Sequence, residues 1–308
     1  LLKTKRFNEG WKEYEWRWEL DEVKKGQGSK LITSKPEWIP GKNGRVLLWE
    51  EQGLGDVFLF SSLIPDFLSK ADQLIIAIDK RLIPLFERSF PKSVVFVNRN
   101  DFIDEKKYDF QISMGSLAKY LRTSLKSFKT AKKLRLNIDK CLSEKLRSNL
   151  IDSDFEKIVG ISWKSSGNTN TFQNFTLEEF ILGLHSPKIR FICLQYGDVQ
   201  KELNHLIKKH KIDVYKSDEV DLFKDIDGLA ALIYACDEIV SIDNLTPFLA
   251  GALGKKSNVL LPFNSYWYHG IDDCESYWYE SMKYYRNNNS KNWDKVFNKI
   301  KKDIKIEN

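Results

Sequence analysis

A turn that contains two glycines is the part of this sequence best suited to chemistry. Gln52, Gly53, Gly55 and Asp56 follow a short apolar run and precede a second apolar segment. Glycine lets the backbone turn tightly and approach a ligand, and the helix expected next offers unpaired N–H groups at its start. An aspartate at position 56 either caps that helix or accepts a proton from a hydroxyl nucleophile. The residues alone leave both interpretations open.

A second candidate binding segment lies near residue 245. Asp243, Asn244 and Thr246 follow an apolar run. Thr246 suits an N-cap, Pro247 the first helical position, and Gly254 the residue just past the helix end. The positive end of such a helix, with Asn244 and Thr246, is a candidate diphosphate seat. A purely structural strand-to-helix connection is the alternative.

Two further segments carry polar groups after apolar runs. Lys164, Ser165, Ser166 and Asn168 supply a cation, two hydroxyls and an amide in one loop, and Gln195 follows another apolar run. This set suits an anionic ligand. Lysines and serines in loops are more often simply solvated, which is the alternative. Aromatic residues at 266–268 could stack on a base or sugar, but packing is the favoured interpretation.

Composition narrows the class of protein. The chain has 308 residues, 42% of them hydrophobic, and a net charge of +6. The length suits two domains, and the lysines form no basic tract, which favours phosphorylated ligands over nucleic acid. Since no apolar run is long enough for a transmembrane segment or a secretion signal, we expect a cytoplasmic protein. The chain begins inside a helical pattern, so we expect an upstream region before Leu1.

The sequence lacks the motifs of several enzyme classes. It contains no P-loop, no H-E-x-x-H zinc motif and no G-x-S-x-G elbow, and its G-x-G turn is not continued to a third glycine. Its four cysteines show neither zinc nor disulfide spacing, so we expect reduced thiols. His205 and His210 are five residues apart, which does not favour a metal pair, and we expect them to face solvent.

Alternating strand and helix patterns predict two α/β halves. An amphipathic helix comes first, at 7–20, and a closing helix comes last, at 291–302. The first half has strands at 45–49, 73–78, 93–97 and 109–112 and helices at 57–70 and 81–90. The second has strands at 157–163, 189–194, 212–215, 238–242 and 258–261 and helices at 176–184, 199–209, 228–235 and 247–253. We therefore predict domains at 44–150 and 151–290, flanked by 1–43 and 291–308, with the ligand between them at the carboxyl ends of both sheets.

Several of these segments together resemble one known family. They are 51–56, 159–163, 194–198 and 230–254, with 7–18 and 276–279 at the two ends. The chain resembles the heptosyltransferase-like glycosyltransferase domain that follows tetratricopeptide repeats in many bacterial proteins. The resemblance implies a GT-B fold of two Rossmann-like, doubly wound domains after a short N-terminal helical segment. It also implies an acceptor on the first domain, a nucleotide sugar on the second, and no metal or other cofactor.

The resemblance also implies roles for individual residues. Asp56 matches the aspartate thought to act as base toward the acceptor hydroxyl, and we expect Lys164, Asn244 and Thr246 to hold the donor diphosphate. The chain departs from the family at Phe248, usually His, at Asn174, usually part of a basic or Arg-Ser pair, and at Trp267, often Arg. Each departure removes a possible phosphate or sugar contact.

Two functions follow from this comparison of residues. The first is sugar transfer from a nucleotide sugar to a hydroxyl of a glycan, a lipid-linked saccharide or a protein. The alternative is a catalytically degenerate module that supports upstream tetratricopeptide repeats, which would bind a protein partner.

Overall fold

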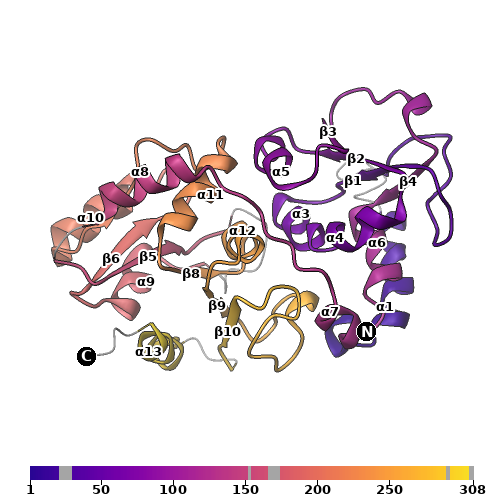
Figure 1. The fold of residues 1–308 in the computed structure, drawn as a ribbon. Coiled ribbons are helices and arrows are strands. Elements are labelled where there is room, and N and C mark those ends of the chain that lie inside the picture. Colours follow the sequence, from indigo (N-terminus) through magenta and orange to yellow (C-terminus); the bar gives the residue numbers. More distant parts are fainter. Residues whose placement is uncertain (21–29, 152–153, 166–173, 289–291, 305–308) are drawn as a thin grey trace. The chain divides into compact units, whose positions relative to one another are not determined.

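The strands form two separate parallel sheets, in the α/β pattern that the sequence predicts (Figure 1). The computed structural model describes residues 1–20, 30–151, 154–165, 174–288 and 292–304. Two compact units result, the first made of Leu1–Asn137 with Tyr266–Asp272 and the second of Ile138–Ser265 with Asp273–Asn308. Each unit holds one of the two sheets.

The first sheet has four strands in the order β3-β2-β1-β4. They are β1 (Arg45–Trp49), β2 (Gln73–Ile78), β3 (Val94–Asn98) and β4 (Phe110–Ser113). Runs of Val, Leu and Ile make β1 and β2 buried along almost their whole length, as parallel strands usually are. From β1 the chain winds outward through β2 and β3 and then returns to place β4 on the other side of β1.

The helices of the first unit are short. They are α1 (Phe7–Tyr14), α3 (Leu54–Ser61), α4 (Ile64–Phe67), α5 (Ile83–Ser89), α6 (Met114–Leu121) and α7 (Leu125–Lys129), and α1 continues as a 3-10 helix, η2 (Glu15–Glu19). The single helix predicted at 57–70 is wrong. Pro65 has no N–H for the carbonyl of Ser61, and the Ser61 and Ser62 hydroxyls donate to carbonyls three residues earlier, so the helix breaks there.

One face of the first sheet is covered by side chains from segments outside the main helices. Leu47, Trp49 and Ile75 form a buried cluster, and Trp18 packs against it with its ring centroid 5.4 Å from that of Trp49. The Trp49 indole N–H also donates to Gln111 at 2.7 Å across the sheet. The segment before β1 therefore contributes directly to the core of the first unit.

The second sheet has six strands in the order β10-β9-β8-β5-β6-β7. They are β5 (Lys157–Ser162), β6 (Ile189–Cys193), β7 (Val214–Tyr215), β8 (Glu238–Ile242), β9 (Ser257–Leu261) and β10 (Met282–Arg286). All neighbours are parallel. The sequence did not predict β10, the edge strand that pairs with β9.

Helices cover the second sheet. They are α8 (Lys140–Leu150), α9 (Leu177–Leu184), α10 (Gln200–His210), α11 (Ile226–Ala235), α12 (Leu245–Leu253) and α13 (Asp294–Asp303). Side chains from α9, α10 and α13 join one buried cluster with β5, β6 and β8, while α11 packs against α8 and α12. The predicted closing helix thus exists, three residues later than expected at its start.

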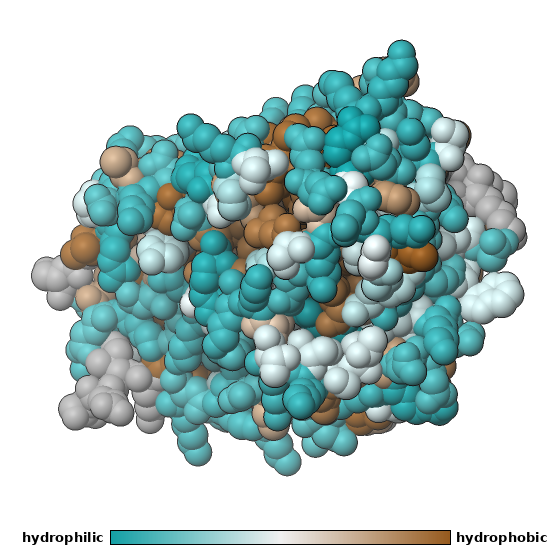
Figure 2. All heavy atoms as spheres, turned by 45° about the vertical axis from the view of Figure 1, so that its right-hand side comes forward, coloured by the Kyte–Doolittle hydropathy of each residue, from teal (hydrophilic) through white to brown (hydrophobic). Residues whose placement is uncertain are grey.

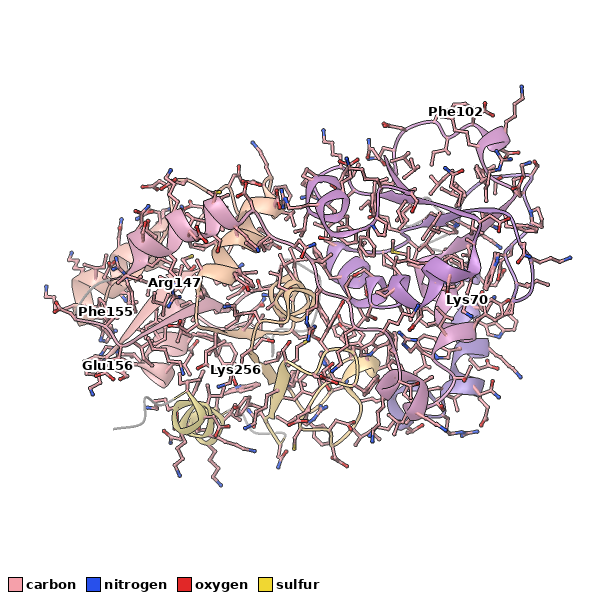
Figure 3. All side chains as sticks on the ribbon, in the orientation of Figure 1. Lys70, Phe102, Arg147, Phe155, Glu156 and Lys256 are labelled. Atoms are coloured by element: carbon pink, nitrogen blue, oxygen red, sulfur yellow. The ribbon has the colours of Figure 1, made fainter. Side chains whose placement is uncertain are left out.

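The helix α8 belongs to the second unit, although it precedes residue 151, where the sequence analysis began the second domain. Arg147, labelled on α8 in Figure 3, donates to the Ala235 carbonyl at 2.5 Å and to the Asp237 carboxylate at 2.8 Å. These bonds tie α8 to the end of α11.

Surface and thiol properties agree with a folded chain that buries its apolar side chains. Figure 2 shows mainly hydrophilic residues on the displayed face, with groups of apolar residues near its middle. Phe102, on the loop after β3 (Figure 3), is an exposed apolar residue. The four cysteines form no disulfide, and burial raises the pKa of Cys193 to about 11 and that of Cys236 to about 12.

No helix in the described ranges combines the length and apolar character needed to cross a membrane.

Each sheet has one point where the strand order reverses. In the first it lies between β1 and β4, and in the second between β5 and β8. Ligands of open α/β sheets bind outside the carboxyl ends of the strands at such a point. The residues after these four strands are therefore the ones to examine.

Candidate functional site

The glycine turn lies at the carboxyl end of β1, next to the reversal point of the first sheet. Gly53 is the N-cap of α3 with φ −72° and ψ 167°, an ordinary extended backbone, and Gly55 is inside the helix. A left-handed backbone is therefore not what requires glycine at position 53. A Cβ on Gly53 would meet one atom, the Asp56 Oδ2 at 3.6 Å. Because Gly53 has no side chain, the space above its backbone stays open, and a ligand can approach there.

Asp56 is the third residue of α3, so its interpretation as the N-cap is wrong. The chain enters the helix at Gly53 because the apolar residues Val57 and Phe58 must reach the core, which sets the helical phase. The half-buried Asp56 carboxylate lies beside Gly53, and a negative charge in the first turn also suits the helix dipole. Its geometry remains compatible with a base.

Two buried carboxylates at the end of β1 were not singled out from the sequence. Glu50 accepts from Arg99 at 2.5 Å and from the Asp79 N–H at 2.8 Å, which ties the end of β1 to the segments after β2 and β3. Glu51 points the other way, as adjacent residues of an extended strand do, and accepts from Arg17 at 2.7 Å. Burial raises the pKa of both carboxyls. The sequence signal that could have identified them is a pair of acidic residues directly after an apolar strand.

Arg17 lies across the reversal point of the first sheet. Its Nη2 donates to Glu51 after β1, to the Ser113 hydroxyl at 3.1 Å at the end of β4, and to the Ser116 hydroxyl at 2.7 Å in α6. Its Nη1 donates to the Tyr14 carbonyl at 2.9 Å and to Glu15 at 2.8 Å. Figure 1 shows α1, which precedes η2, beside α6, and these two helices are in contact.

An aromatic cluster adjoins the glycine turn. The Trp267 ring lies 5.5 Å from Tyr14 and 5.4 Å from Trp11, in edge-on or tilted arrangements. The Tyr14 hydroxyl accepts from the Gln52 side-chain amide at 2.9 Å. Burial, and secondarily the Glu51 charge, raises the pKa of Tyr14 above its usual range, with Asp56 contributing in the same direction. These ring contacts agree with the interpretation of Trp267 as a packing residue.

At the reversal point of the second sheet, Gln195 holds the end of β5. Its Oε1 accepts from the Ser162 hydroxyl at 3.0 Å and from the backbone N–H groups of Trp163 and Lys164 at 3.1 and 2.9 Å. Asn244 completes the arrangement from β8, because its Nδ2 donates to Ser162 at 2.7 Å and to the Lys164 carbonyl at 3.1 Å. The structure thus brings these predicted site residues together.

The N-cap of α12 is Asn244, and its assignment to Thr246 is wrong by two residues. The Asn244 Oδ1 accepts from the Thr246 N–H at 2.9 Å, and Pro247, now the third helical residue, has no N–H. Of the first four positions of α12, Thr246 therefore has its N–H engaged by the cap and Pro247 has none to offer an anion. Gly254 ends the helix in the left-handed conformation at φ 73°, as predicted.

Several groups of the second unit that were predicted to bind the donor already have partners within the protein. The Lys164 ammonium pairs with Glu202, which also accepts from the Leu177 N–H at 3.1 Å. The Ser165 N–H donates to Asn174 at 2.8 Å. Asp243 is buried at the end of β8, near enough to Tyr284 to help raise the pKa of that phenol, although burial is the larger cause. Ser166 and Asn168 lie outside the described residues.

The departures from the family pattern are partly explained by packing. Phe248 is 3% exposed inside α12, and Phe175 joins the buried cluster of α9 and α13. These side chains fill the core where the family has polar residues.

His205 faces solvent as predicted, with 56% of its side chain exposed, whereas His210 is half-buried. Both reach one carboxylate, with Nε2 atoms 3.1 and 2.7 Å from the two oxygens of Glu178, because α10 packs beside α9. Lys209 also bonds this carboxylate at 2.8 Å.

Within the described ranges, no group of three or more His, Cys, Asp or Glu side chains is arranged to hold a metal ion.

A curated protein is similar to this chain in sequence, and solved structures are similar to it in fold. No family model matches it. It is 28% identical to the protein FlbA of Caulobacter vibrioides over 92% of this chain and 50% of that protein, so it spans about half the length of this relative.

Two solved structures have a similar fold. One is a glycosyl transferase family 9 protein from Veillonella parvula, with a TM-score of 0.58 and 12% identity over 79% of this chain and 86% of that one. The other is the ADP-heptose lipopolysaccharide heptosyltransferase II of E. coli, with a TM-score of 0.53 and 12% identity over 80% and 92% of the two chains. The chain therefore has the fold of these glycosyltransferases, the GT-B type.

Proposed function

We propose that the protein transfers a sugar from a nucleotide-sugar donor to a hydroxyl group of an acceptor. One observation carries the proposal. In each unit, the polar residues selected from sequence gather at the carboxyl ends of the strands where the sheet order reverses, with Asp56 beside β1 and Gln195 and Asn244 around β5. Open α/β sheets bind their ligands at these places. The fold shared with two glycosyltransferases supports the same proposal.

In this proposal the first unit binds the acceptor. Asp56 takes the proton from the attacking hydroxyl, which makes the oxygen a better nucleophile as its bond to the sugar forms. Gly53 leaves the space through which the acceptor reaches the carboxylate, because its missing Cβ faces only Asp56. Gln52 and Gly55 belong to the same turn.

The second unit binds the donor in this proposal. As the sugar leaves, negative charge grows on the diphosphate, and a cation or hydrogen-bond donor nearby stabilises it. Lys164 can supply that charge by exchanging its partner Glu202 for the phosphate, and Asn244 and Thr246 lie at the start of α12 on the neighbouring strand connection. Asp243 and Ser165, with Ser166 and Asn168, complete the proposed set. No metal enters this scheme.

The test is a binding panel. Isothermal titration of the protein with nucleotide sugars and nucleoside diphosphates is expected to give saturable binding for at least one nucleoside. The Asn244→Ala variant is expected to weaken it, whereas Asn149→Ala on the exposed side of α8 leaves it unchanged. Absence of binding across the whole panel would refute the proposal.

A second candidate function has specific support. Lys164 is paired with Glu202, Phe248 is buried, and Trp267 is packed between Trp11 and Tyr14, so three positions where the family has phosphate or sugar contacts are otherwise occupied. These contacts favour a degenerate module that supports upstream tetratricopeptide repeats and their protein partner.

A genetic comparison separates the two functions. If Asp56→Asn leaves the glycan and glycoprotein profile of the cell unchanged while deletion of the region upstream of Leu1 alters the phenotype, the supporting role is correct. A changed glycan profile in Asp56→Asn establishes the transferase. Either function is proposed for the cytoplasm of a bacterium, and the acceptor class, whether glycan, lipid-linked saccharide or protein, follows from the product that accumulates.

A further inference from the structure

The segment before β1 enters the ligand-binding edge of the first sheet. The 3-10 helix η2 places Arg17 at the reversal point between β1 and β4, with its side chain only 10% exposed. A guanidinium at this depth needs several acceptors, and it has them on both strands, Glu51 after β1 and Ser113 at the end of β4. A segment that merely connected an upstream region to the fold would have no reason to bury a charge there.

The acceptors of Arg17 flank the turn that carries the proposed base. Glu51 is the residue before Gln52, and its side chain is 2% exposed. Its Oε1 packs against the backbone of Gly115 in α6, where an added Cβ would meet it at 2.0 Å. Arg17 thus holds one oxygen of the Glu51 side chain, and the other oxygen lies close against Gly115. The start of the turn is held with the Glu51 side chain.

A second bond reaches the turn from the same segment. The Tyr14 hydroxyl accepts from Gln52 at 2.9 Å, and the Arg17 guanidinium lies over the Tyr14 ring at 4.2 Å from its centroid. Two consecutive residues of the turn, Glu51 and Gln52, are therefore held by two residues of one short segment. Both bonds hold side chains of the two residues just before Gly53, where the glycine would otherwise leave the chain free to move.

We propose that Arg17 and Tyr14 are positioning residues of the active site, which hold the 51–56 turn so that the Asp56 carboxylate faces the acceptor hydroxyl. The inference rests on the proposed function for the role of Asp56. It makes the segment Phe7–Glu19 a working part of the transferase rather than a connection to upstream repeats. Displacement of a reacting group by about 1 Å can cost about 100-fold in rate, so a loosened turn is expected to lower kcat.

The test compares variants of Arg17 with a matched arginine at the other end of β1. Arg45 pairs with Asp109 through two bonds, at 2.8 and 3.1 Å, at the amino end of the same strand, far along the strand from the turn. Arg17→Met in combination with Glu51→Gln removes the ion pair without leaving a buried carboxylate alone, which favours folding. Arg17→Lys keeps the charge but loses the two-armed guanidinium, whose Nη2 bonds Glu51 while its Nη1 bonds Glu15. Arg45→Met is the control.

Two measurements are made on each variant. The first is amide hydrogen exchange of a peptide covering residues 50–57, which reports the mobility of the turn without any substrate. The second is kcat and KM for the nucleotide sugar that binds the wild type. Arg17→Met/Glu51→Gln is expected to raise exchange in this peptide about tenfold and to lower kcat about 10- to 100-fold, with the donor KM unchanged within about twofold. Arg17→Lys is expected to give a smaller change of the same kind, and Arg45→Met none.

The outcomes separate this inference from the proposed function. Unchanged exchange at residues 50–57 in both Arg17 variants overturns the positioning role, whatever the turnover. Faster exchange with an unchanged kcat also overturns it, because the turn would then not matter for the reaction. A wild type that turns over no nucleotide sugar refutes the proposed function alone, while the exchange data still decide whether Arg17 holds the turn.

Discussion

Arg17 donates to Glu51 at 2.7 Å, and the two side chains are 10% and 2% exposed. This bond joins a residue before the first strand to one just after it, so the N-terminal segment and the sheet form one cooperative unit. Arg17→Met alone leaves a buried carboxylate without its cation, which is expected to cost about 3 kcal/mol or more of unfolding free energy.

Urea denaturation checks this expectation with a double-mutant cycle. Arg17→Met/Glu51→Gln should recover most of the loss, because the unpaired charge is gone. Losses that simply add in the double variant would contradict a direct interaction between these two residues.

Substitution by alanine is expected to lower the unfolding free energy at one glycine, Gly183, and to leave it nearly unchanged at another, Gly53. At Gly183, an added Cβ would meet three ring atoms of Phe297 at 2.5 to 2.8 Å, so Gly183→Ala must push α13 away from α9 and should cost about 2 kcal/mol. At Gly53 the Cβ has room and the backbone is ordinary, so Gly53→Ala should change unfolding free energy by less than about 0.5 kcal/mol. If Gly53 serves an approaching acceptor, the same variant raises the acceptor KM. An unaltered acceptor KM would remove that role from Gly53.

Trp267 provides a test of packing against ligand stacking. Its ring contacts Trp11 and Tyr14, so Trp267→Ala should lower the unfolding free energy of the first unit by about 3 kcal/mol. Trp16, which is 66% exposed, is the control, and Trp16→Ala should cost less than about 0.5 kcal/mol. A Trp267→Ala protein of wild-type stability that binds donor or acceptor less tightly would show that the ring serves a ligand instead.

The cluster around Glu178 predicts an acid-sensitive contact. Bonds from Lys209 and then from His210 lower the pKa of Glu178 to about 2, below its ordinary 4.5. A lowered pKa in the folded state means that the stabilisation is present above about pH 4.5 and is lost as the pH falls toward 2. Glu178→Gln should therefore be less stable than the wild type at pH 6, and the difference should vanish near pH 2.

Urea midpoints at both pH values measure this difference, with Glu144→Gln on the exposed side of α8 as the control. An equal gap at pH 6 and pH 2 would mean that the charge of Glu178 is not what stabilises this contact.

Local patterns in the sequence were enough to predict most of the sheet. Strands β1, β2 and β8 have the predicted bounds, and several others differ by one residue, because each is a buried apolar run between polar segments. The edge strand β10 was missed because Met282–Arg286 mixes charged and aromatic residues without a regular alternation. It becomes a strand only through pairing with β9, a partner more than 20 residues away in the chain.

The sequence was enough to select many residues of the candidate site, but not to predict which of them are hydrogen-bonded to one another. Asn244 and Thr246 are both good helix caps, and the choice of Asn244 depends on its bond to Ser162, 82 residues earlier. Arg17 and Tyr14 give no local sign that they reach the glycine turn, because their partners lie 34 and 38 residues further along the chain. Long-range contacts of this kind follow from the fold and cannot be read from spacing.

The most direct test of the account is sugar transfer by the wild type and by Asp56→Asn. The protein is incubated with each nucleotide sugar that binds and a mixture of glycan acceptors, and release of nucleoside diphosphate is followed together with the product mass. We expect the wild type to release nucleoside diphosphate and Asp56→Asn to release it at a rate at least about 100-fold lower, with folding unaffected. The control Asp72→Asn, at an exposed position of the same unit, should keep the full rate. Equal rates for the wild type and Asp56→Asn, or no release from any donor, would contradict the account.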